Sequence, residues 1–236
     1  MKKLLFFLLP LSFCSFYVQA QEDEDDYFKS KISGSFESNS QWYLNDKGRG
    51  IAHPEEPVRS NNYLLLNYQI WRFTVGAQVE SYAPNALLNY NPGYNNTDLA
   101  LYFLNYKDNK LDITAGNYYE QFGSGLLLRA WEDRALGINT SLFGGKIIYR
   151  PSDNVRFTAL YGRQRSGFDL ARGDIYGFDS DFNLSKLLSF EESDLSFGAS
   201  YVGRYEEVTI PDPNFDALTN AFAGRINFIH GSFYAS

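Results

Sequence analysis

The feature that most constrains the fold of this chain is a two-residue period, in which apolar and polar side chains alternate along segments of about ten residues. In the segment 73–80 the odd positions are apolar, while Thr74, Gly76, Gln78 and Glu80 occupy the even ones. The same alternation recurs at 111–116, 155–162 and 195–202. Strands of this length suit a tilted path through a membrane, because strands of soluble sheets typically have only about five or six residues.

The spacing of these segments predicts about ten strands. We place them at 29–44, 61–70, 72–82, 98–107, 110–119, 141–150, 154–164, 174–184, 194–205 and 221–233. The connections between the strands alternate in length. Short connections fall near residue 71 and at 108–109 and 151–154, and a somewhat longer one at 185–193. Between them lie longer polar loops at 45–60, 83–97, 121–139, 165–173 and 206–220.

This alternation of lengths predicts an all-β, antiparallel up-and-down transmembrane β-barrel. In a closed meander every second connection lies on the same rim, so short turns face one side of the membrane and long loops the other. Aromatic residues make up 17% of the chain, and several lie near strand ends, as interfacial girdles require: Trp42, Trp71, Tyr106, Tyr149 and Tyr205. A soluble secreted β-rich adhesin or binding protein is an alternative interpretation.

Residues 1–20 have the features of a cleavable export signal. Lys2 and Lys3 precede an apolar run, and Val18 and Ala20 occupy the small-residue positions before a cleavage site. A lipoprotein signal with Cys14 as the lipidated residue is the alternative. We therefore expect export to the cell outer membrane, with 1–20 removed, 21–28 as an acidic mature N-terminus and 29–236 as the barrel strands with their loops.

The charge and the cysteine content exclude several classes of function. The chain has 28 acidic against 21 basic side chains, which argues against a nucleic-acid partner. The acidic run at 22–26 is typical of a solvated tail, because no glycine-turned calcium loop follows it. Cys14 is the single cysteine and leaves with the signal, which excludes disulfides and cysteine metal sites. We expect no cofactor and no metal.

Catalytic chemistry has few candidates in this sequence. The two histidines, His53 and His230, are too scattered for a zinc site. His230 and Ser232 have the His-x-Ser spacing of outer-membrane phospholipases, but Phe233 stands where those enzymes have asparagine. We therefore expect no catalytic residues and no enzymatic activity, with a lipolytic barrel enzyme as the alternative.

One segment, 116–139, breaks the strand pattern. It passes through Gly123-Ser124-Gly125 and Leu126-Leu127-Leu128 into a charged cluster. The candidate pore or docking residues are Arg129, Trp131, Glu132, Asp133 and Arg134. Three interpretations remain open: a surface loop with a helical turn and an Arg129–Glu132 ion pair, a segment folded into the lumen that narrows the pore, or a docking element for a partner protein. The apolar run 126–128 is expected to need burial.

The same segment resembles a family of uncharacterised outer-membrane β-barrel proteins of Bacteroidota. The resemblance lies in Phe122-Gly-Ser-Gly-Leu-Leu-Leu-Arg129, Glu132-Asp-Arg134 and Leu136-Gly-Ile138. It implies a barrel in the outer membrane, and no established activity comes with it. Members of that family are longer than this chain, and the last strand lacks the closing aromatic residue of many barrels. We therefore expect an N-terminal fragment of a larger barrel.

These observations predict a non-enzymatic outer-membrane protein. Its expected role is that of a pore, or a structural or transport role in the envelope, with 121–139 as lumen constriction or docking element. The expected partners are outer-membrane lipid and other envelope or secretion proteins.

Overall fold

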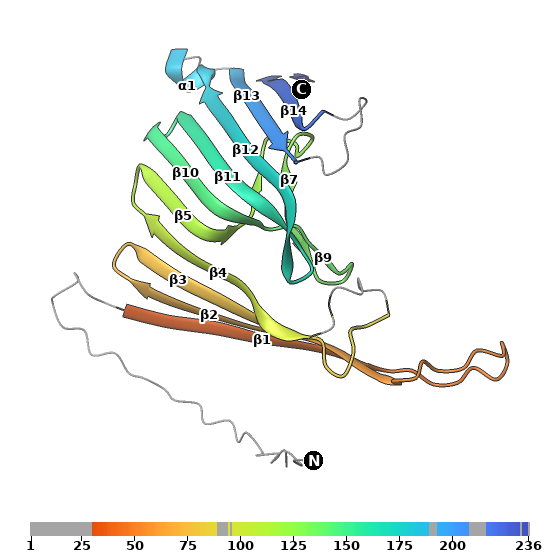
Figure 1. Cartoon of the computed structure of the whole chain (residues 1–236). Coiled ribbons are helices and arrows are strands. Elements are labelled where there is room, and N and C mark those ends of the chain that lie inside the picture. Colours follow the sequence, from red (N-terminus) through yellow and green to blue (C-terminus); the bar gives the residue numbers. More distant parts are fainter. Residues whose placement is uncertain are drawn as a thin grey trace.

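The structure, a computed structural model, describes residues 30–88, 94, 96–188, 193–207, 216–231 and 233–235. The predicted signal 1–20, the acidic segment 21–28 and Ser232 lie outside these residues. The chain forms one large antiparallel sheet of 11 strands, in which strands that follow one another in the sequence order are hydrogen-bonded neighbours (Figure 1). The predicted all-β, antiparallel up-and-down fold class is therefore confirmed.

The strands of this sheet are β1 (Ser30–Trp42), β2 (Val58–Ile70), β3 (Phe73–Ser81), β4 (Thr97–Lys107), β5 (Leu111–Tyr118), β10 (Leu142–Ser152), β11 (Val155–Ser166), β12 (Asp169–Asn183), β13 (Ser193–Tyr205), β14 (Leu218–His230) and the short β15 (Phe233–Ala235). Two small two-stranded sheets lie between β5 and β10 in the sequence. They pair β6 (Glu120–Gln121) with β7 (Arg129–Ala130), and β8 (Glu132–Asp133) with β9 (Ile138–Asn139). Among the described residues, β1 and β15 are the two edges of the large sheet and do not pair with each other.

The prediction of a long loop at 165–173 is wrong. Arg165 and Ser166 pair with Leu170 and Asp169, so the β11–β12 hairpin continues beyond a bulge to a tight turn. Gly167 adopts a φ of +66° in this turn, a conformation that glycine accepts without steric cost. The hairpin is therefore longer than the polar composition of this stretch suggested.

The connection after β12 contains a helical turn that the sequence did not predict, α1 (Leu184–Leu188). The Asn183 side-chain oxygen accepts the Lys186 backbone N–H at 3.0 Å, as an N-cap does. None of the helical structure in the described part of the chain has the length and apolar character needed to cross a membrane.

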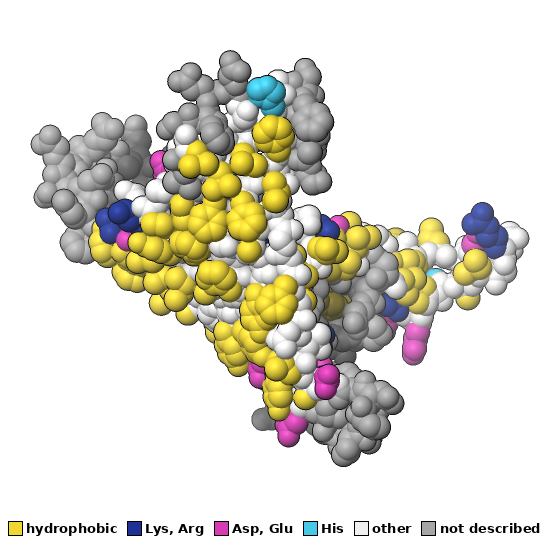
Figure 2. Space-filling view, turned by 90° about the horizontal axis from the view of Figure 1, so that it is seen from above, with side chains coloured by type: hydrophobic (Ala, Val, Ile, Leu, Met, Phe, Trp, Pro, Cys, Tyr) yellow, Lys and Arg dark blue, Asp and Glu magenta, His cyan; other side chains and the backbone are white. Residues whose placement is uncertain are grey.

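The two-residue period gives the sheet one apolar face. Large hydrophobic side chains stay exposed on it although each sits in a regular strand. The strand register sets them side by side, as for Val75 with Leu104 and Ile113 with Ile147. Figure 2 shows hydrophobic side chains covering much of the surface, with charged residues toward its margins. We call this the apolar face.

The opposite face, here the polar face, carries amides, hydroxyls and paired charges. Glu120 binds Lys146 at 3.1 Å and Arg156 at 3.2 Å, and the Arg225 guanidinium bridges Asp179 and Asp181. These charges are compensated within the face, as is usual for partly buried ionic groups.

Candidate functional site

The 119–141 segment lies on the polar face, anchored by apolar side chains. Phe122, Leu128 and Ala130 are buried, and they share one cluster with residues of the sheet: Tyr118, Leu142, Leu160 and Ile175. Gly177 of β12 makes room for this packing, because an added Cβ there would lie 2.8 Å from the Phe122 ring. The segment therefore rests on β5, β10, β11 and β12.

The expected burial of the whole run 126–128 is wrong. Leu128 is buried, whereas the side chain of Leu126 is 85% exposed. The difference arises because Gly123 and Gly125, both with positive φ, form a turn between β6 and β7, and Leu126 lies in that turn. The Phe122 N–H donates to the Leu128 carbonyl at 3.1 Å, which closes the turn beside the buried anchor.

The predicted helical turn and the Arg129–Glu132 pair are also wrong. Arg129 and Glu132 belong to β7 and β8, and an extended backbone does not place residues three apart on one face. The exposed Arg129 guanidinium instead lies over the Trp131 ring, 4.2 Å from its centroid. Asp133 accepts the N–H groups of Ala135 and Leu136, each at 3.0 Å, and so fixes the β8–β9 turn.

Arg134 extends the segment across the polar face to the first strands. Its guanidinium contacts Glu37 of β1 at 2.5 Å, Glu132 at 3.4 Å and the Gln78 side-chain oxygen of β3 at 3.3 Å. It also lies over the Tyr63 ring, 4.4 Å from the centroid. Burial lowers the pKa of Arg134, but the Glu132 and Glu37 carboxylates outweigh it and raise the pKa above its usual value. Arg134 therefore stays charged and ties the segment to β1 and β3.

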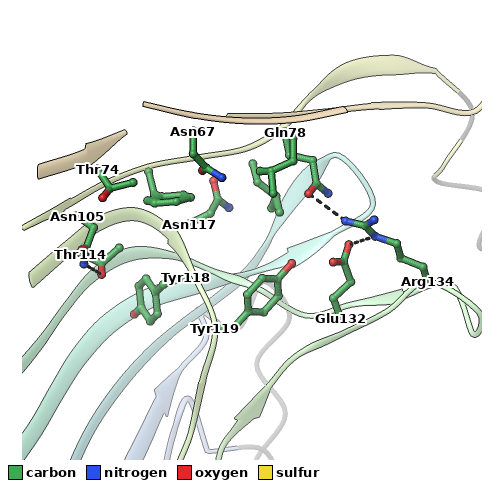
Figure 3. A pocket seen from close by; sticks show the side chains of 13 residues that line it. Asn67, Thr74, Gln78, Asn105, Thr114, Asn117, Tyr118, Tyr119, Glu132 and Arg134 are labelled. Carbon is green, nitrogen blue, oxygen red and sulfur yellow. Dashed lines mark hydrogen bonds and ion pairs between the residues drawn. The ribbon is translucent and has the colours of Figure 1, made fainter. Parts of the chain in front are cut away.

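A cavity of about 450 Å³ lies between this segment and strands β2 to β5 (Figure 3). Its lining is Leu65, Asn67, Thr74, Gln78, Leu101, Phe103, Asn105, Thr114, Asn117, Tyr118, Tyr119, Glu132 and Arg134. Glu132 and Arg134 are the charged members of this set, and they pair with each other. Burial and the nearby Glu132 charge raise the pKa of Tyr119, so its phenol is neutral at physiological pH. The cavity surface is thus mainly apolar, with a few polar groups and without an uncompensated charge.

A second element, the tip of the β11–β12 hairpin, also folds over the polar face. Arg165 donates to both Glu80 oxygens, at 2.8 and 2.7 Å, and the two side chains are 2% and 1% exposed. Gln78 and Tyr82 donate to the same carboxylate. The rings of Tyr94 and Phe168 lie 5.4 and 5.7 Å from the guanidinium.

This ion pair requires the polar face to be concave. Strands β4, β5 and β10 separate β3 from β11 in the sheet. Four strand spacings amount to about 19 Å in a flat sheet, far beyond the reach of an Arg–Glu contact. Figure 1 shows the corresponding curl of the sheet and the bend of the hairpin toward β4. The candidate site is therefore the hollow of this curved sheet, bordered by the 119–141 segment and the hairpin tip.

The residues of the alternative catalytic interpretation do not form a described centre. His230 is exposed, and its Nδ1 lies 2.8 Å from the Ser193 hydroxyl, while Ser232 is outside the described residues. Within the described ranges, no group of three or more His, Cys, Asp or Glu side chains could hold a metal ion.

The sequence missed the buried Glu80–Arg165 pair and most of the cavity lining. Glu80 and Arg165 are 85 positions apart, so no local pattern joins them. The one available signal was the alternation itself, which placed Thr74, Gln78 and Glu80 on the same face of one strand.

Comparison with known proteins gives a family match and a set of porin structures. The family described as "Family of unknown function (DUF6029)" matches residues 1–236. The chain is similar to a BenF-like porin from Pseudomonas fluorescens Pf-5, with 6% identity and a TM-score of 0.45, over 87% of this chain and 59% of that one. It is also similar to Pseudomonas aeruginosa OpdQ, with 10% identity and a TM-score of 0.37, over 89% and 58%. No curated protein matches the sequence.

Proposed function

We propose that this chain, which belongs to the DUF6029 family of unknown function, acts as a non-enzymatic outer-membrane β-barrel protein with a pore or envelope-transport role. The observation that carries the proposal is the opposite polarity of the two sheet faces. The apolar face exposes side chains such as Leu66 at 51%, Leu104 at 46% and Ile147 at 48%, while the polar face holds compensated charges.

Lipid is the medium that suits such an apolar face. Monomeric soluble proteins rarely expose contiguous apolar patches larger than a few hundred Å². A membrane barrel faces lipid with its apolar side and water with its polar side, and it satisfies every backbone group through strand pairing. The proposed surroundings are therefore outer-membrane lipid on the apolar face and a water-filled lumen on the polar face. The Bacteroidota origin implied by the resemblance stays a prediction.

The 121–139 segment is the proposed constriction of this lumen. Arg134, in the turn between β8 and β9, contacts Glu37 of β1 and Gln78 of β3. Phe122 and Leu128 pack the other end of the segment on the sheet. A fixed charge held in this way affects which ions pass a narrow section. Docking of an envelope or secretion protein is the second proposed use of the segment, because Leu126 and Leu136 are exposed at its turns.

Planar-bilayer recording tests the pore. The full chain, purified from membranes, is expected to produce stepwise currents. In Arg134→Gln the loss of a fixed cation is expected to shift ion selectivity toward cations and to change the single-channel conductance. Arg49→Gln is the matched control, because Arg49 is 81% exposed at the 46–51 turn and is expected to leave both quantities unchanged.

Two results would contradict the proposal. A mature protein that stays soluble without detergent would exclude the membrane location. Currents with the same ion selectivity in wild type and Arg134→Gln would exclude the constriction, although the pore itself would stand.

A further inference from the structure

The cavity of the polar face has the size and lining of a small-molecule site. Its volume of about 450 Å³ falls within the roughly 300–1,000 Å³ of ligand pockets. Amides, hydroxyls and aromatic rings meet there, beside the aliphatic side chains of Leu65 and Leu101 (Figure 3). Such a mixture suits a ligand that has both hydrogen-bonding groups and apolar C–H surfaces.

The charges around this cavity are already compensated. Glu132 and Arg134 pair at its border, and Arg134 also binds Glu37. Asp112, beyond the Asn105 side, pairs with Lys107 at 3.9 Å and accepts the Asn105 amide N–H at 2.7 Å. A charged ligand would meet no unpaired counter-ion among these described residues and would lose hydration on entry. The lining therefore favours an uncharged ligand.

The amides of the lining include a buried acceptor. The Asn67 side-chain oxygen is buried and accepts no hydrogen bond from a described residue. It lies over Gly76, where an added Cβ would come within 2.6 Å of it. A buried acceptor without a donor destabilises the structure, because the desolvation of its oxygen is not compensated. Asn67 lines the cavity, so a rotation of its amide toward the cavity would let a ligand hydroxyl supply that donor.

Neighbouring groups extend this hydrogen-bonding surface. The Asn117 side-chain oxygen accepts the Tyr102 N–H at 2.9 Å. The amide nitrogen of Asn117 is therefore the end of the side chain that can donate to an acceptor on a ligand. Thr74 adds a hydroxyl on the neighbouring strand of the lining. The rings of Phe103 and Tyr119 provide flat apolar surfaces nearby.

We propose that this cavity binds a neutral saccharide. Sugar hydroxyls pair with planar amides and with threonine, and the C–H face of a sugar ring packs on an aromatic ring. The proposal rests on the proposed function in one respect, namely that the cavity lies in the lumen of the pore. If the cavity lies in the lumen, neutral saccharides are the class of solute that the pore is proposed to bind.

Titration calorimetry on the full detergent-solubilised chain measures this binding without requiring a conducting pore. The probes are glucose and maltose, with glucuronate as the charged analogue. Saturable heat is expected for the neutral sugars and none for glucuronate. Asn67→Leu and Thr74→Val, both near-isosteric, are each expected to weaken binding roughly threefold to tenfold, the effect of one neutral hydrogen bond.

Asn227→Leu is the matched control for these variants. Asn227 lies on the polar face of β14, donates to Ser196 at 3.2 Å and is not part of the cavity lining, so its replacement is expected to leave sugar affinity unchanged. Tighter binding of glucuronate than of glucose would overturn the proposal, and so would unchanged affinity in both Asn67→Leu and Thr74→Val.

The two hypotheses fail separately. Sugar binding in detergent without bilayer currents would contradict the pore and support the saccharide site. Bilayer currents without any heat of sugar binding would contradict the saccharide site and leave the pore intact.

Discussion

At the scale of single residues, the site depends on glycines that let other groups approach the backbone. Gly116 has a φ of +104°, and an added Cβ would overlap the Tyr102 carbonyl oxygen and lie 2.9 Å from the Phe103 Cα. Both obstacles are backbone atoms, which cannot rotate away as a side chain can. Gly116 therefore fixes the close approach of β4 and β5 beside the cavity.

We predict that Gly116→Ala destabilises the folded chain substantially. The unfavourable backbone conformation alone costs about 1–3 kcal/mol, and the steric overlap adds to it. The measurement is the temperature at which the folded form disappears in heat-modifiability gels. Gly145→Ala is the control, because an added Cβ there meets its nearest atom only at 3.9 Å, an ordinary contact. If the folded form disappeared at the same temperature in both variants, the proposed steric role of Gly116 would be contradicted.

At the scale of elements, the β11–β12 hairpin is held over the polar face by a buried charge pair and by the packing of Phe168 on Tyr82 and Tyr94. Arg165 and Glu80 are almost fully excluded from solvent, so each needs the other. Removing one partner of such a pair leaves an uncompensated buried charge and typically costs about 3–5 kcal/mol. Replacing both with apolar groups avoids that penalty.

We therefore predict that Glu80→Leu and Arg165→Met each release the hairpin tip, while the double variant restores much of the docking. Limited proteolysis near Gly167 measures the release, because a tip lifted from the sheet exposes its backbone. Arg204→Met serves as control, since Arg204 pairs with Glu206 at the exposed surface. A double variant that is cleaved faster than either single one would show that the apolar pair does not substitute for the ions.

At the scale of the whole molecule, the two faces of the sheet impose different limits on substitution. Leu66 on the apolar face lies in register with Gly34 and Ala77, and its side chain is 51% exposed. Gln69 lies on the polar face of the same strand, β2. A charge on the lipid side is costly, whereas a charge toward the lumen changes selectivity.

We predict that Leu66→Arg makes the free energy of insertion into lipid vesicles less favourable by about 2–4 kcal/mol, the cost of an arginine that faces lipid near the bilayer midplane. Gln69→Arg is expected to insert with the free energy of the wild type. The measurement is the folding equilibrium from denaturant into vesicles of defined thickness. Insertion of Leu66→Arg with wild-type free energy would indicate that the apolar face contacts something other than lipid.

The whole-molecule architecture was largely predictable from the sequence. Alternating polarity placed strands such as β3 and β13 within a residue or so of their observed bounds, because burial of one face selects the register. The site was less predictable. The contacts of Arg134 with Glu37 and of Arg165 with Glu80 join residues 97 and 85 positions apart. They depend on the curvature of the sheet, which no local pattern encodes.

The register across β5 and β10 has a further consequence. Tyr118 and Leu142 are direct partners, although the whole 119–141 segment lies between them in the sequence. The chain thus leaves the sheet and returns to the adjacent position, so the excursion could be exchanged for another of different length without altering the strand ladder. The pairing of β5 with β10 therefore does not fix the length of the segment that lies between these two strands in the sequence.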